Sequence, residues 1–130
     1  MPAGAGKKRT KRQTEQTFQA SLVKSLAMVL ERDTFFFAVP NGGYRTRAEA
    51  AILIGQGVVA GMTDLVVFHG GRAFCMELKA PDGTTSNDQD ACHARIRAAG
   101  VPVAIVRSLP DALAFFKANG IPTRVIGAKE

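Results

Sequence analysis

Residues 61–79, GMTDLVVFHGGRAFCMELK, decide the fold of this chain. Two apolar runs in this stretch flank the dipeptide Gly70-Gly71. Both central positions of a two-residue hairpin turn need a positive φ, which glycine adopts readily. The stretch therefore predicts a β-hairpin in which His69 pairs with Arg72.

This register sets Asp64 directly opposite Glu77 at the open end of the hairpin. Opposed residues share one face of the sheet, and the alternation along the strand adds Lys79 to that face. Like charges that face each other destabilise a sheet by a few tenths to about 1 kcal/mol. Such a pair in otherwise apolar strands points to a cation between the two carboxylates.

Two other interpretations of the same stretch stay open at this point. A three-residue turn would set Asp64 opposite Met76, which would place Asp64 and Glu77 on opposite faces unless a bulge restored the register. Alternatively, the charges at the open end of the hairpin are simply solvated.

Length and composition predict a single domain with its own core, since the chain has 130 residues of which 46% are hydrophobic. Cys75 and Cys92 match no zinc spacing and no disulfide framework, so we expect buried, reduced thiols in a cytoplasmic protein. No apolar run is long enough to span a bilayer, and no hydrophobic stretch follows the N-terminal bases. We therefore expect neither a membrane partner nor a signal peptide.

The net charge of +6 is concentrated at the N-terminus. Residues 1–13 contain no acid and five bases, namely Lys7, Lys8, Arg9, Lys11 and Arg12. This composition predicts a basic disordered tail that could bind phosphate backbones by counterion release. The alternative is an extension that only aids solubility. The folded domain is expected at residues 14–120, followed by a C-terminal tail at 121–130.

The first element predicted is a helix that begins near Thr14, as its N-cap, and runs to about Arg32. Its buried stripe recurs at three- and four-residue steps, through Phe18, Leu22, Leu26 and Val29. Glu15 falls on this stripe, in what would be the first turn. It is therefore a candidate third ligand for a cation, or a carboxylate that only interacts with the helix dipole.

The remaining elements predict an α/β domain. A buried strand is expected at 35–39, followed by a loop whose Tyr44, Arg45 and Arg47 could grip phosphates or be merely solvated. A short helix is expected at 46–54.

Beyond the hairpin, Ser86 and Gln89 form a capping box for a helix that ends at Gly100, and Gln89 could also reach the site. A strand at 101–106 and a helix capped by Ser108 and running to about Ala118 complete the order α-β-(short α)-β-β-α-β-α.

Asp64 and the triplet Glu77-Leu78-Lys79 resemble the PD-(D/E)xK nuclease signature, with Met62-Thr63-Asp64 where that superfamily usually shows Pro-Asp. Further pieces resemble its VRR-NUC branch, over about residues 14–116: Glu15, Pro40-Asn41-Gly42-Gly43, the segment 57–64, Gln89 and Val103-Ala104-Ile105-Val106-Arg107. The resemblance implies a restriction-endonuclease-like αβββαβ core, with a mixed four-stranded sheet flanked by helices.

The resemblance also implies a metal-dependent DNA nuclease. Asp64 and Glu77 would hold Mg²⁺, for which Mn²⁺ would substitute, with the Leu78 carbonyl and Glu15 as further ligands. Lys79 would orient or deprotonate the attacking water, and Gln89 would position water or phosphate. Hard oxygen ligands suffice for this chemistry, which argues against zinc.

Small standalone proteins of this branch, typical of phages and prophages, cut branched DNA such as four-way junctions. The resemblance thus implies branched DNA as partner, the cytoplasm of a bacterial or phage-infected cell as location, and a C₂ homodimer, because cutting two strands calls for two sites. The alternatives are a flap, nicking or restriction-like nuclease, or a non-catalytic DNA-binding module that keeps only the fold.

Overall fold

The computed structural model describes residues 11–40 and 45–124 of the chain. The predicted DNA contacts Lys7, Lys8, Arg9 and Tyr44 lie outside the described residues, as does the C-terminal segment 125–130.

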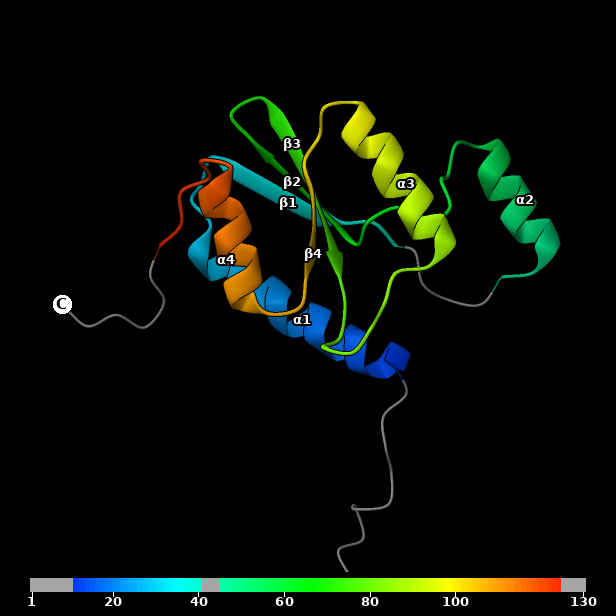
Figure 1. The fold of residues 1–130 in the computed structure, drawn as a ribbon, viewed down its shortest axis with the longest axis horizontal. Helices are drawn as coiled ribbons and strands as arrows, with labels where there is room; N and C mark the ends of the chain where they lie inside the picture. The colour runs from blue at the N-terminus through cyan, green and yellow to red at the C-terminus, as the bar shows by residue number, and fades with distance from the viewer. Residues whose placement is uncertain (1–10, 41–44, 125–130) are drawn as a thin grey trace, which may run out of the picture.

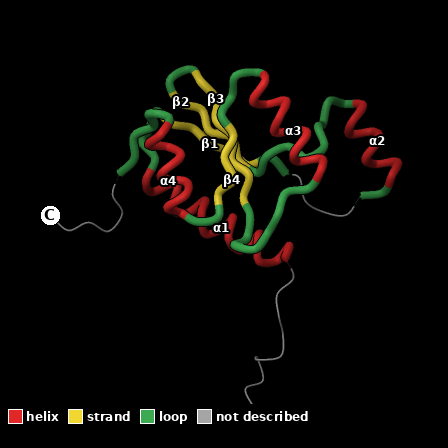
Figure 2. Tube along the Cα trace, viewed as in Figure 1, coloured by secondary structure: helices red, strands yellow, loops and turns green. Residues whose placement is uncertain are grey.

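The elements follow the predicted order: α1 (Lys11–Val29), β1 (Thr34–Ala38), α2 (Arg47–Gly55), β2 (Leu65–His69), β3 (Arg72–Leu78), α3 (Asn87–Ala98), β4 (Val103–Val106) and α4 (Leu109–Ala118) (Figure 1). The four strands form one mixed sheet in the order β1-β2-β3-β4. Neighbouring strands are antiparallel except β3 and β4, which are parallel. The α/β class and the mixed four-stranded sheet flanked by helices are thereby confirmed (Figure 2).

The β2–β3 hairpin has the predicted two-residue turn. His69 pairs with Arg72, and Gly70 and Gly71 have φ values of 60° and 76°. The three-residue turn is therefore wrong. The carbonyl of Asp64 accepts a hydrogen bond from the amide of Val39, so this residue continues the β1–β2 ladder by one step.

The two faces of the sheet are covered unequally. Alternate strand residues on one face pack against α1 and α4 and form the core, which includes Leu22, Leu26, Val29, Leu65, Val67, Phe74, Met76, Val106 and Phe116. On the other face α3 covers only part of the sheet, where its buried Cys92 and His93 lie. This incomplete cover leaves the β1 end of that face open.

The prediction that the strand at 35–39 is buried is wrong. β1 is an edge strand of the sheet, and Phe35 is 62% exposed. Its ring lies near those of Phe37 and Phe68, with centroids 5.8 and 6.3 Å away. Only the alternate side chain, Phe36, packs against the core. The aromatic run therefore predicted a buried strand, although the side of β1 that carries Phe35 and Phe37 is exposed.

The two ends of α1 differ from the predicted ends, Thr14 and about Arg32. The helix begins at Lys11, so that Thr14 is a helical residue and Glu15 lies beyond the first turn, which contains no acid. The helix ends at Val29 rather than Arg32. The reason is tertiary, because the chain beyond Ile121 returns to this point: Arg124 donates its amide to the carbonyl of Val29.

The segment 121–124, which was assigned from the sequence to the C-terminal tail, contacts the folded domain. Ile121 is buried in the core, and Thr123 forms an isolated bridge with Leu30. The predicted caps of the last two helices are confirmed, since Ser86 and Gln89 form a capping box on α3 and Ser108 caps α4. In the described ranges no helix is both long and apolar enough to cross a bilayer.

Candidate active site

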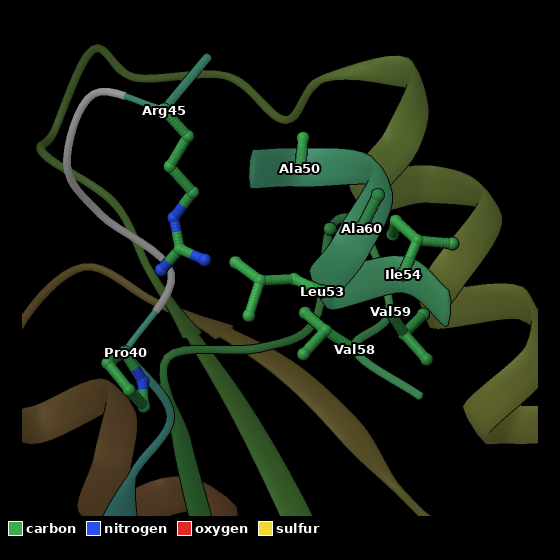
Figure 3. A pocket seen from close by; sticks show the side chains of 9 residues that line it. Pro40, Arg45, Ala50, Leu53, Ile54, Val58, Val59 and Ala60 are labelled. Carbon is green, nitrogen blue, oxygen red and sulfur yellow. The ribbon is translucent and has the colours of Figure 1, made fainter. Parts of the chain in front are cut away.

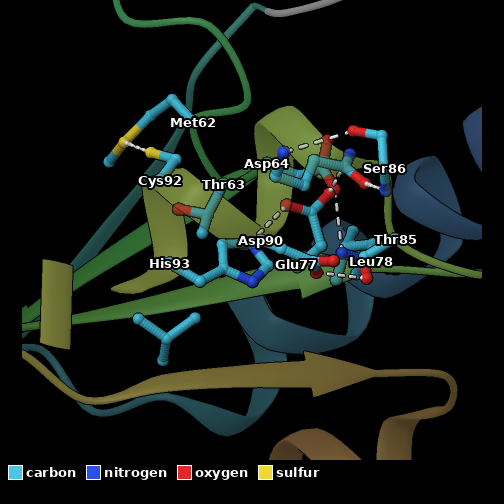
Figure 4. Close-up of polar contacts among 12 residues, drawn as sticks. Met62, Thr63, Asp64, Glu77, Leu78, Thr85, Ser86, Asp90, Cys92 and His93 are labelled. Carbon is cyan, nitrogen blue, oxygen red and sulfur yellow. Dashed lines mark hydrogen bonds and ion pairs between the residues drawn. The ribbon is translucent and has the colours of Figure 1, made fainter. Parts of the chain in front are cut away.

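The open end of the β2–β3 hairpin brings Asp64 and Glu77 together. The Oδ2 atom of Asp64 accepts a 2.8 Å hydrogen bond from the amide of Leu78, which fixes this carboxylate against the end of β3 (Figure 4). A side-chain hydrogen bond joins Asp64 to Glu77. The predicted convergence of the two carboxyl groups on one face is therefore present in the structure.

Two side chains of α3 also contact the carboxyl group of Glu77. Gln89 donates its Nε2 to Oε2 of Glu77 at 3.2 Å. The Nε2 atom of His93 lies 3.0 Å from Oε1 of Glu77 (Figure 4). Gln89 and His93 are four residues apart, so they share one face of the helix. The same Gln89 accepts the Ser86 amide with its Oε1 at 2.9 Å, and thus serves the cap and the site at once.

His93 was not predicted at the site. It is buried, and burial is the main cause that lowers its pKa, so the imidazole is neutral at pH 7. The available sequence signal was its position one turn after Gln89 on the capped helix. That signal alone does not say which face of α3 meets the sheet, and no carboxylate partner was assigned to it.

The environment of Glu77 favours the protonated acid. The side chain is 1% exposed, and burial raises its pKa to about 9, followed by the hydrogen bond and the charge of Asp64. Lys79 lowers the pKa of Glu77, while Glu15 raises it. In the metal-free protein Glu77 therefore keeps its proton near neutral pH.

Lys79 follows β3 directly and is held by a hydrogen bond from its amide to the carbonyl of Val106, at 3.0 Å. It is buried, and its charge acts on both Glu77 and His93. In the part of the chain that the structure describes, its ammonium forms no ion pair with a carboxylate.

Glu15 approaches the site from α1. It is half-buried, and a Cβ added at Gly83 would lie 3.3 Å from its Oε2 atom. The loop that contains Gly83 follows Lys79 and is held by Arg107, whose Nη1 donates to the carbonyls of Ala80 and Gly83 at 2.8 and 2.7 Å. Glu15 is thus turned towards the site, and its role as a ligand stays a prediction.

Arg45 and Arg47, predicted to contact DNA, are exposed at the start of α2. Neither of them is among the described contacts of Asp64, Glu77 or Lys79. The structure therefore does not bring these two arginines into the carboxylate cluster. Lys11 and Arg12, from the predicted basic tail, belong to the first turn of α1.

The donor set suits a hard cation that keeps much of its water. Among the described residues, no three His, Cys, Asp or Glu side chains gather closely enough to enclose a metal ion. Mg²⁺ is usually bound through one or two carboxylates and retains several waters, so the pair of Asp64 and Glu77 is sufficient. A divalent cation that replaced the proton on Glu77 would offset the negative charge of both carboxylates.

The raised pKa of Glu77 makes stability depend on pH. The folded protein keeps a proton on Glu77 up to about pH 9, whereas the unfolded chain loses it above about 4.5, so stability falls as the pH rises between these values. We expect the free energy of unfolding in EDTA to fall by up to about 1.4 kcal/mol per pH unit between about pH 7 and 8.5. Urea unfolding of the parent and of Glu77→Gln measures this slope, which the variant should lose.

Glu49→Gln is the control for this experiment. Its backbone and side-chain hydrogen bonds with Thr46 lower the pKa of Glu49, so this group is ionised in both states throughout the range tested. The control should keep the parental slope even if it loses stability at the cap of α2. Equal slopes in the parent and in Glu77→Gln would show that Glu77 does not hold the proton.

Comparison with known proteins supports the architecture. The fold is similar to that of a solved structure described as a VRR_NUC domain protein, with a TM-score of 0.58 over 79% of this chain and 84% of that chain. The two sequences are 15% identical, so the likeness concerns the fold. No family model matches the chain. No curated protein matches it with significance.

Proposed function

We propose that this chain is a metal-dependent DNA nuclease of the VRR-NUC type. The observation that carries the proposal is the hydrogen-bonded pair of the buried Glu77 and the half-buried Asp64, with Lys79 two residues after Glu77. A fold that serves only as a scaffold gains nothing from burying an acid against a second acid, because a buried charge beside a like charge is costly. The similarity of the fold to a VRR_NUC domain protein supports the same assignment.

Asp64 and Glu77 are the proposed metal ligands, with the carbonyl of Leu78 and the carboxylate of Glu15 completing the set directly or through water. When bound, Mg²⁺ supplies an acidic water and neutralises negative charge at the phosphate. Asp64 is held for this task by the amide of Leu78. Mn²⁺, which also accepts oxygen ligands, is expected to substitute.

Lys79 and α3 complete the proposed site. The ammonium of Lys79 holds the attacking water or a phosphate oxygen and stabilises the negative charge that develops there. Gln89 and His93 keep the carboxyl of Glu77 in one orientation, and the remaining lone pair of the Gln89 Oε1 atom can also orient water. All these groups come from a hairpin end and one helix face, so the site depends on the packing of α3 against the sheet.

The proposed substrate is branched DNA, such as a four-way junction, cut by a homodimer that carries one site per subunit. Arg45, Arg47 and the bases Lys7, Lys8, Arg9, Lys11 and Arg12 are the proposed phosphate contacts, in addition to Tyr44. These contacts would supply affinity that does not depend on sequence and that falls with salt.

The test is a panel of labelled junction, flap, duplex and single-stranded DNA, incubated with Mg²⁺ or with EDTA. We expect Mg²⁺-dependent cleavage with preference for the junction. Lys79→Ala should lower the cleavage rate by at least about a hundredfold, as expected for a group that acts on the proton or the charge in the transition state. Its metal-free DNA binding should fall only modestly, because one positive charge is lost.

Lys117→Ala is the matched control, since Lys117 is an exposed lysine in the last turn of α4. It should leave the cleavage rate at the parental value. Preference for flap or nicked duplex would keep the nuclease and change its substrate. No Mg²⁺-dependent cleavage of any substrate would favour the non-catalytic DNA-binding module.

A further inference from the structure

Three phenylalanine rings, those of Phe35, Phe37 and Phe68, form an aromatic patch on the open face of the sheet. Phe35 and Phe37 alternate along β1, and Phe68 lies directly opposite Phe35 on β2. The three residues are 62%, 36% and 45% exposed. Their ring centroids lie 5.8, 6.3 and 5.4 Å apart. Exposed apolar residues that are scattered singly are normal on a surface, whereas a contiguous group of them is a candidate binding site.

The aromatic patch lies on the same face of the sheet as the candidate active site. Side chains alternate along a strand, so Asp64 projects to the same side as Phe68. Val39 donates its amide to the carbonyl of Asp64, which makes Phe37 a diagonal neighbour of Asp64, at a distance of about 7–8 Å in a regular sheet. A ligand bound across the patch would therefore reach the carboxyl groups without leaving this face.

The size of the patch argues against a second folded protein as its occupant. One aromatic side chain contributes about 150–250 Å² on burial, so three rings stay below the roughly 800 Å² per partner that is typical of a stable protein interface. Two neighbours on the same face, Val66 and Cys75, are buried and cannot enlarge the patch. The patch is therefore suited to small planar groups.

The charges around the patch indicate which planar groups these are. The patch itself is uncharged, so it cannot hold phosphates, which need basic side chains. Beyond the end of β1, however, Arg45 points into a hollow of about 260 Å³ that Pro40 and Leu53 also line (Figure 3). Glu49 offsets part of this charge, although its carboxylate already accepts the amide of Thr46. Rings beside a basic side chain are the arrangement by which proteins bind single-stranded nucleic acid.

The two ends of the patch differ in charge. At the turn end Asp33 is exposed, and its Oδ1 lies 4.0 Å from Nδ1 of His69. At the other end Asp64 and Glu77 would hold a divalent cation, which attracts phosphate. A strand on the patch is therefore expected to place a phosphate at the carboxyl groups and its nucleobases towards the turn.

The distances between the rings favour nucleobases that are not paired. Neighbouring bases of one strand in B-DNA are about 3.4 Å apart, which is closer than the spacing of the rings. Bases inside a duplex also have both faces covered by their neighbours. A single strand drawn out of the duplex can instead set its bases on the rings, whatever their sequence, because every base has a π-face.

We infer that the aromatic patch stacks unpaired nucleobases of the DNA strand beside the cleavage site, so that the chain selects DNA with a single-stranded segment there. The inference rests on the proposed function, since a DNA strand held at Asp64 is what brings nucleobases to the rings. It adds a site for the bases to a site that so far accounts only for phosphate and metal.

The test measures binding in EDTA, where no cleavage occurs. One probe is a labelled single strand of thymidines, and the other is a strand of equal length with abasic sites, which carries the same phosphates without the bases. Phe35→Ala should weaken binding of the thymidine strand by at least about fivefold, as is typical for the loss of one stacked base. Its affinity for the abasic strand should stay at the parental value, because no charge is lost.

Three further variants make this result specific. Phe35→Trp keeps an aromatic ring and should bind the thymidine strand as tightly as the parent does. Met28→Ala is the matched control, since Met28 is an apolar residue on α1 that is 59% exposed, and it should also keep the parental affinity. Circular dichroism checks folding, and Phe35→Leu, which stays apolar but has no ring, repeats the test if Phe35→Ala does not fold.

The outcomes separate this inference from the proposed function. Parental affinity of Phe35→Ala for the thymidine strand, or equal losses on both probes, overturns the inference even if the protein cuts DNA. Sedimentation that shows a dimer in the parent and a monomer in Phe35→Ala also overturns it, and assigns the patch to a second copy of the chain. Base binding that depends on Phe35 in a protein that cuts no DNA leaves the patch in place and refutes only the nuclease.

Discussion

Asp64→Asn should abolish cleavage while it leaves DNA binding intact. The substitution keeps the shape of the side chain and an oxygen that accepts the amide of Leu78, but it removes the charge that a divalent cation needs. We expect the cleavage rate to fall by at least about a hundred- to a thousandfold, which is the loss typical for one preorganised electrostatic group. Binding of uncleaved DNA in EDTA, followed by fluorescence anisotropy, should stay the same or become tighter, because one negative charge near the phosphates is gone.

The same variant has a second readout that does not depend on cleavage. Mg²⁺ that binds only the folded protein raises its Tm, so the parent should be stabilised by added Mg²⁺ and Asp64→Asn should not. Without metal the variant should keep about the stability of the parent, because its amide oxygen still accepts the hydrogen bond of the Leu78 amide. Asp33→Asn is the control, because Asp33 is exposed and lies at the turn end of the hairpin, near His69. Parental cleavage by a purified Asp64→Asn protein would overturn the assignment of this site.

Gly61→Ala should be the most destabilising single-methyl change near the site. Gly61 has a φ of +80°, which costs a residue with a side chain about 1–2 kcal/mol. In addition, a Cβ at this position would lie only 2.3 Å from the carbonyl oxygen of Asp88, so that the first turn of α3 would have to shift. Overpacking of this kind typically adds about 1–3 kcal/mol. The shift would also displace Gln89 from Glu77, so cleavage should fall together with stability.

Gly57→Ala separates the cost of the positive φ from the cost of the steric clash. Gly57 also has a positive φ, of +101°, but nothing lies within 4 Å of its added Cβ. It should therefore show the backbone penalty without the clash. Urea unfolding of both variants measures the difference, which we assign to the contact between Gly61 and α3. If the two variants lost the same free energy of unfolding, the contact between Gly61 and α3 would not be a tight one.

The elements that were predicted well are those with strong local signals. The Gly70-Gly71 dipeptide fixes the turn, and the turn fixes the register, so the pairing of Asp64 with Glu77 follows from a few neighbouring residues. The cap at Ser86 likewise needs only the four residues that form it.

The features that the sequence did not predict depend on contacts between segments far apart in the chain. The end of α1 is set by Arg124, and the exposure of Phe35 is set by which strand lies at the edge of the sheet. The place of His93 against Glu77 depends on how α3 rotates onto the sheet, about which a helical pattern alone says nothing. The N-terminus of α1 has no strong stop signal, since the residues before Thr14 are themselves good helix formers.

The double contact of Gln89 has a consequence for protein engineering. The Gln89 side chain closes the first turn of α3 and also holds the carboxyl of Glu77. The hairpin and the helix therefore cannot be separated without loss of a contact in the site. A transplant of the hairpin alone onto another scaffold would carry Asp64, Glu77 and Lys79 but leave Glu77 unsupported. A portable unit therefore needs at least the continuous stretch 61–98, which keeps Asp64, Glu77 and the whole of α3 with its cap and His93 in a single segment.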